Sequence, residues 1–167
     1  MVSRHLGVRI SRANVESRRL AEAAVHDLGI ATGTTWSTVI ARIEERYRKP
    51  IVVAAADDDE LADLSGLWID YPTHGYIAYR AGDAPYYQWH SFAHELGHVA
   101  LDHDSCAVLE ALDFEAVKRW GLGSDVRRMR ARGLLDTPDE QAAEHFASAL
   151  VRRMLQQHIG PEEMIFG

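Results

Sequence analysis

A five-residue motif, His94-Glu95-Leu96-Gly97-His98, constrains the fold of this chain more tightly than any other feature. On an α-helix, residues four apart leave the same face, so both imidazoles can reach one metal ion if the segment is helical. Apolar residues on both sides of the motif, such as Phe92 and Val99, favour a helix with a buried flank. We therefore expect a helix over residues 85–101 that carries a zinc (Zn²⁺) site on one face.

The glutamate of the motif points to catalysis. Glu95 directly follows the first histidine, so it lies beside the expected metal and not on it. A carboxylate placed there can take a proton from a zinc-bound water and pass it to a leaving amine. A purely structural zinc site has no use for such a base, so we interpret Glu95 as a general base.

A catalytic zinc site needs a third protein ligand and an open fourth position. Glu140 and Glu144 follow a helix-start signal at Thr137-Pro138 and share a face of a helix expected over residues 137–157. One could bind the metal while the other accepts the outer N–H of a ligand histidine. Both could instead be solvated carboxylates of a first helical turn.

The segment that follows the motif contains three weaker candidates for a ligand or another functional role. Asp104 follows His98 by six residues, the spacing of the third ligand in one class of zinc peptidases, but the glycine turn of that class is missing here. In a continuous helix His103 lies about 140° around from His98, which favours a solvent-facing or supporting role. Cys106 is the one cysteine, so no intramolecular disulfide can form, and we expect it to be a small, at least half-buried residue.

Apolar periodicity predicts the remaining elements. Helices are expected over residues 11–29, from a cap at Thr34/Thr35 to Pro50, and over 106–120. The β-branched run 51–55 predicts a strand, and the alternation over 65–79 predicts a β-hairpin whose exposed edge could hold an extended peptide. The fold class is therefore α+β, mostly helical, with a short three-stranded antiparallel or mixed sheet.

Composition narrows the class of protein. With 167 residues, 47% of them hydrophobic, the chain fits a single domain over 1–167, in which residues 1–30 form an N-terminal helical extension. Its net charge of −7 disfavours direct nucleic-acid binding. There is no apolar run long enough for an ordinary membrane-spanning helix and no secretion signal, so we expect no membrane association and a cytoplasmic location.

Taken together, these segments resemble the ImmA/IrrE family of zinc metallopeptidases over about residues 36–157. The likeness rests on the hairpin, on the run from Ser91 to His98, and on Glu140-x-x-Ala143-Glu144-x-Phe146-Ala147. It implies a small zincin-like domain in which His94, His98 and Glu140 bind zinc, Glu95 is the base, and Glu144 takes the acidic position behind the ligands in gluzincins. Two departures are Asp102, where the family often has histidine, and residues 150–154, where it often has Leu-Leu-x-Pro.

The resemblance implies a zinc-dependent endopeptidase that cleaves a protein substrate, such as a separately encoded helix-turn-helix repressor in a stress or mobile-element circuit. The alternative is a non-catalytic zinc protein that sequesters a transcription factor. A metal-dependent ribonuclease is disfavoured because its third histidine would fall at Asp104. A peptidase also needs a stabiliser for the oxyanion or a substrate contact, and the sequence offers a set of candidates: Tyr76 and His145, with Tyr71, Tyr86 and His74.

Overall fold

The computed structural model describes residues 12–57, 61, 64–103, 128–131 and 137–155. They form a mixed α+β fold, as predicted. The elements are α1 (Arg12–Asp27), α2 (Trp36–Tyr47), β1 (Ile51–Ala56), β2 (Gly66–Asp70), β3 (Gly75–Arg80), α4 (Pro85–Ala100), β4 (Arg128–Ala131) and α6 (Pro138–Leu155). None of the described helices has the length and apolar character needed to cross a bilayer. The helix predicted over 106–120 and residue Cys106 lie outside the described residues.

Local signals mark the ends of α2. Thr35 is its N-cap, and the Thr35 hydroxyl accepts a hydrogen bond from the Thr38 amide at 3.3 Å. At the other end Arg48 adopts a left-handed conformation with φ 62°, and Pro50 follows two residues later. The predicted start and stop of this helix are confirmed.

The sheet contains one strand more than the sequence predicted. Its strand order is β1-β3-β2-β4, with β1 parallel to β3 and the other neighbours antiparallel. The β2–β3 hairpin is confirmed, but each of its strands has a neighbour on the outer side. The prediction that the hairpin has an exposed edge is therefore wrong. Alternation along a strand shows which residues share a face, but it does not show which distant segment pairs with that strand.

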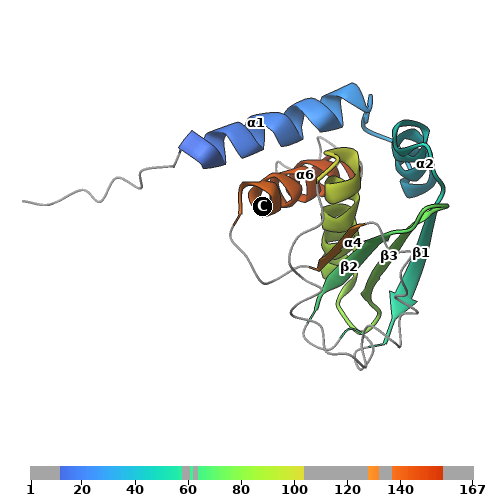
Figure 1. Cartoon of the computed structure of the whole chain (residues 1–167). Helices are drawn as coiled ribbons and strands as arrows, with labels where there is room; N and C mark the ends of the chain where they lie inside the picture. The colour runs from blue at the N-terminus through green and yellow to red at the C-terminus, as the bar shows by residue number, and fades with distance from the viewer. Residues whose placement is uncertain (1–11, 58–60, 62–63, 104–127, 132–136, 156–167) are drawn as a thin grey trace, which may run out of the picture.

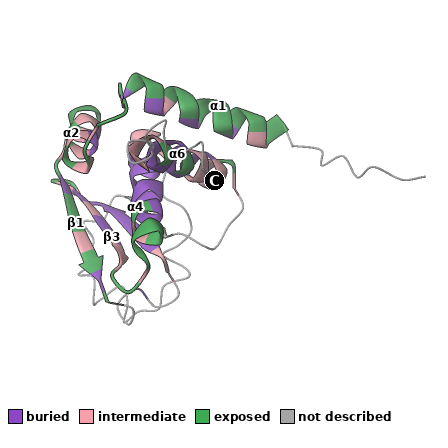
Figure 2. Ribbon diagram, turned by 180° about the vertical axis from the view of Figure 1, so that it is seen from behind, coloured by how far each residue is buried: buried purple, intermediate pink, exposed green. Residues whose placement is uncertain are grey.

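Alternation along the hairpin divides the side chains between the two faces of the sheet. Trp68 and Ile77 belong to the main core, which includes the helices. Leu67 and Ile69 belong to a second cluster on the opposite face, completed by Leu61, Leu64 and other residues. Figure 2 shows that α4, which lies against the first face, is buried along most of its length. The helix that carries the motif is therefore the central element of the fold.

The first helix packs against the last one. Figure 1 shows α1 lying across α6, with α4 between α6 and the sheet. Ala21 and Val25 are fully buried in the main core. The Ser17 hydroxyl donates to the Pro138 carbonyl at 2.9 Å, at the first residue of α6. Residues 12–27, predicted as part of an N-terminal extension, therefore contribute to the same core as α6.

Candidate metal centre

The histidines of the motif lie on a row of residues spaced by four along α4. Tyr86, His90, His94 and His98 share this face, and His94 and His98 are only 2% and 1% exposed. The face meets α6, and Gly97 permits the close approach. A Cβ at position 97 would stand 3.1 Å from the Phe146 ring and 3.2 Å from the Ala143 Cα. The small residue in the motif thus brings the second helix within reach of the histidines.

Three potential ligand residues meet at this contact. The His94 and His98 Nε2 atoms are 3.0 Å apart. Glu140 Oε2 lies 3.2 Å from His94 Nε2, and Glu140 Oε1 lies 3.5 Å from His98 Nε2. A tetrahedral ion with bonds of about 2.0–2.1 Å separates its ligand atoms by about 3.3–3.4 Å. The described residues thus contain a His-His-Glu group that could hold a metal ion.

The charges at this contact favour a cation. Burial alone would raise the pKa of Glu140, but its hydrogen bonds with His94 and His98 bring that pKa well below its usual range. Burial would likewise lower the pKa of His94, but hydrogen bonds with Glu140 and Glu144 and the charge of Glu95 raise it to about 9. The carboxylates therefore stabilise positive charge at this point, either as a proton or as a metal ion.

Glu144 lies behind His94, on the side away from the three ligand atoms. Its Oε2 is 3.4 Å from His94 Nδ1, and its Oε1 is 3.3 Å from His90 Nε2. The His90 ring also lies 3.5 Å from the Ser148 hydroxyl. The sequence predicts a carboxylate behind a ligand histidine, but the prediction did not include His90. The available signal was its position four residues before His94.

His98 has a comparable neighbour on its outer side. His103 Nδ1 lies 2.9 Å from His98 Nδ1, and His103 Nε2 lies 3.9 Å from Asp139 Oδ1. His103 therefore supports the His98 ring, which is one of the two roles expected for it. The 140° angle predicted between the two residues does not apply, because α4 ends before His103. Asp104, the rival third ligand, lies outside the described residues.

Glu95 is fully buried where α4 meets β2. A Cβ at Gly66 would stand 2.8 Å from Glu95 Oε1, so the missing side chain on β2 provides space for the carboxylate. The negative charge of Glu95 contributes to the raised pKa of His94, which places the carboxylate near the group of possible ligands. A potential base and three potential ligands thus share one region.

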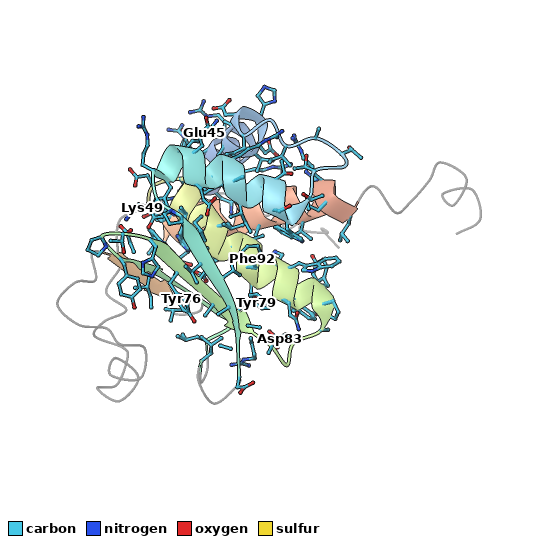
Figure 3. The ribbon with its side chains drawn as sticks, turned by 90° about the vertical axis from the view of Figure 1, so that its right-hand side faces the viewer. Glu45, Lys49, Tyr76, Tyr79, Asp83 and Phe92 are labelled. Atoms are coloured by element: carbon cyan, nitrogen blue, oxygen red, sulfur yellow. The ribbon has the colours of Figure 1, made fainter. Side chains whose placement is uncertain are left out.

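The candidates for an oxyanion or substrate contact lie in different parts of the molecule. Tyr76 packs in the second cluster, on the sheet face turned away from Tyr79 and Phe92 (Figure 3). The Tyr71 ring stacks on His74 with centroids 4.7 Å apart. His145 lines a cavity of about 240 Å³ whose lining comes from α1 and α6.

Tyr86 lies against the row of histidines, with its ring centroid 6.0 Å from that of His90. Half of its surface is exposed. The structure thus places Tyr86, and not the favoured Tyr76 or His145, on the face of α4 that carries the possible ligands.

Comparison of the chain with protein-family models, with curated proteins and with solved structures gave no match.

Proposed function

We propose that this chain is a zinc-dependent metallo-endopeptidase in which His94, His98 and Glu140 hold the ion and Glu95 is the general base. The observation that carries the proposal is the convergence of three ligand residues from two helices, whose Nε2 and carboxylate oxygen atoms approach one another to 3.0–3.5 Å. Two histidines and a glutamate are the ligand set of thermolysin-type peptidases. The resemblance to the ImmA/IrrE family supports the same assignment.

The number of ligands favours catalysis over a structural role. Structural zinc sites are closed by four protein ligands, whereas catalytic sites have three and leave one position open. Within the described residues the group contains three. When bound, the ion would supply a Lewis acid that polarises the scissile carbonyl and makes water acidic enough to lose a proton near neutral pH.

The protein's own groups provide the proton transfers. Glu95 accepts the proton of the attacking water and donates it to the leaving amine. Its position against Gly66 limits the carboxylate to a small region, so its orientation is set before a substrate arrives. Glu144 and His103 lie behind the two histidines and restrain their rings.

The proposed substrate is a protein, with a separately encoded helix-turn-helix repressor as the first candidate and the cytoplasm as the place of action. Both edges of the hairpin are paired, so in the described sheet the positions for an added peptide strand are the outer strands, β1 and β4. This arrangement replaces the predicted binding of a peptide to the hairpin itself.

The test compares the wild-type chain with Glu95→Gln, Glu140→Ala and Glu45→Gln, the last being a control on the exposed surface of α2. Zinc content is measured by mass spectrometry, and cleavage is measured on co-expressed candidate repressors. We expect Glu95→Gln to keep its zinc and to lose about 10²–10⁴-fold in cleavage rate. Glu140→Ala should lose zinc, and Glu45→Gln should match the wild type.

Two results would contradict the proposal. Full zinc content in Glu140→Ala would show that the third ligand is another residue. Inactivation of a repressor that survives Glu95→Gln, without any cut in the repressor chain, would support sequestration by a non-catalytic zinc protein instead.

A further inference from the structure

We infer that His103 is a positioning residue of the metal centre, which holds the His98 ring through a hydrogen bond between their Nδ1 atoms. The inference rests on the proposed function in one respect, namely that His98 binds the metal through Nε2. His103 follows His98 by five residues. On a continuous helix, residues four apart share a face, so a spacing of five would not bring the two rings together.

The ring-to-ring contact determines where the protons are. The two Nδ1 atoms are 2.9 Å apart, so one must donate and the other accept. His98 Nε2 faces His94 and Glu140, and a metal there needs the lone pair of that nitrogen. His98 must then carry its proton on Nδ1 and donate it to His103 Nδ1. His103 in turn carries its own proton on Nε2.

Asp139 favours the same tautomer of His103. Its Oδ1 lies 3.9 Å from His103 Nε2, which is beyond hydrogen-bond distance but near enough for the negative charge to favour a proton on that nitrogen. Asp139 directly precedes Glu140, the possible ligand on α6. A line of contacts therefore runs from His98 on α4 through His103 to the first turn of α6.

The backbone at the end of α4 returns His103 to His98. Asp102 adopts a left-handed conformation with φ 51°. The Asp102 amide donates to the Val99 carbonyl at 3.2 Å, and the His103 amide donates to the His98 carbonyl at 3.0 Å. These two bonds define a Schellman motif, in which the side chain of the last residue commonly contacts that of the residue five positions earlier.

In Schellman motifs that side-chain contact is frequently hydrophobic, but here it joins two imidazoles. The residue at the start of the contact is the possible ligand His98, so the structure that ends the helix also supports the ligand. Aspartate is one of the few non-glycine residues that adopt the left-handed conformation without large strain. The sequence Asp102-His103 is therefore suited to both tasks.

The test measures zinc affinity by competition with a chelator, using the full chain. The variants are His103→Ala, His103→Gln and the control His26→Ala, an exposed histidine on α1. We expect His103→Ala to bind zinc about 10–100-fold more weakly. His103→Gln should recover much of the affinity, because its amide oxygen can accept the Nδ1 proton of His98. His26→Ala should match the wild type.

A second measurement reports the tautomers directly. Long-range ¹H–¹⁵N spectra of the zinc-loaded wild type should show His98 protonated on Nδ1 and His103 protonated on Nε2. Zinc on Nε2 alone would place the His98 proton on Nδ1, so the deciding signal is a scalar coupling through the hydrogen bond between the two Nδ1 nuclei, which a residue that only fills space would not show. This measurement also decides the question if His103→Ala fails to fold.

Unchanged zinc affinity in His103→Ala, or a proton on Nδ1 of His103, would overturn the role of His103 and leave the proposed peptidase intact. Wild-type protein that binds no zinc, or His94→Ala protein that binds zinc as tightly as the wild type, would overturn both. Loss of zinc affinity in His103→Ala together with absent peptidase activity would support the positioning role and contradict only the proposed reaction.

Discussion

Gly97 in α4 and Ala143 in α6 are so close that a methyl group on Gly97 would stand 3.2 Å from both the Cα and the carbonyl oxygen of Ala143. The two helices that supply the possible ligands thus meet at two of the smallest residues. Their separation there sets how near Glu140 comes to the histidines. Changes at this contact should therefore affect both stability and metal binding.

We expect Gly97→Ala to destabilise the protein and to weaken zinc binding. Alanine favours a helix over glycine by about 1 kcal/mol. Overpacking a tight contact costs about 1–3 kcal/mol, and the nearest neighbours are backbone atoms and a buried ring, which cannot easily yield. Chemical denaturation and chelator competition measure the two effects. The exposed turn residue Gly82 provides the control Gly82→Ala, and a more stable Gly97→Ala protein with unchanged zinc affinity would contradict the prediction.

Gly66→Ala should separate metal binding from catalysis. The added methyl group would stand 2.8 Å from Glu95 Oε1, so the carboxylate must move while the three possible ligands stay in place. We expect full zinc content, a cleavage rate lowered at least about tenfold, and a loss of about 1–3 kcal/mol in unfolding free energy. A double-mutant cycle with Glu95→Asp, which shortens the side chain, should show a coupling in stability. Independent effects of the two substitutions would rule out the contact as the cause.

Removing the buried carboxylate of Asp70 should destabilise the protein far more than breaking an exposed ion pair. Asp70 is 2% exposed and accepts from both the Lys49 ammonium and the Tyr47 hydroxyl. Asp70→Ala leaves a nearly buried ammonium without its carboxylate, which should cost about 3–5 kcal/mol. Glu22→Ala breaks an exposed pair with Arg18 and should change stability very little, because solvent screens the two charges. Urea denaturation of both variants checks the prediction, and equal losses would contradict it.

The metal-free form should lose stability as the pH rises, whereas the zinc-loaded form should change little. The pKa of His94 is raised from 6.5 to about 9, so its stabilising protonation is complete below pH 6.5 and is lost as the pH rises through 9. The pKa of Glu140 is lowered, so its contribution is present above pH 4.5 and is lost at more acidic pH. Zinc competes with the proton on His94, so zinc affinity should rise over the range in which metal-free stability falls.

Thermal unfolding with a chelator and with added zinc, between pH 6 and pH 9, measures the two trends. The difference between the two midpoints should widen as the pH rises. His94→Gln removes the titrating ring and should flatten the metal-free curve. Parallel curves for the two wild-type forms would contradict the pH prediction.

The elements with local signals could be predicted to within a few residues. The Thr35 cap, the stop before Pro50 and the alternation of Leu67, Trp68 and Ile69 each depend on neighbours in the sequence. The position of β4 beside β2 and the parallel pairing of β1 with β3 depend on packing between segments far apart in the chain. No periodicity within a segment contains that information.

The metal centre shows the same division. The spacing of His94 and His98 predicts that they share a helical face, because helix geometry alone determines it. The sequence leaves Glu140 as one of several candidates for the third ligand, because it does not show that α6 packs against α4 at Gly97. The role of His103 could not be obtained from the angle on a continuous helix, because the left-handed Asp102 ends the helix first.

The hydrogen bond from Ser17 to the Pro138 carbonyl has a consequence for any shortened form of the chain. That carbonyl belongs to the first turn of α6, which also carries Glu140. At the other end of the same helix, Arg153 donates to the Ile30 carbonyl at 2.7 Å. A protease cut or a deletion that removes residues 12–30 would therefore release both ends of α6, and the damage would reach the metal centre through the backbone that supports it.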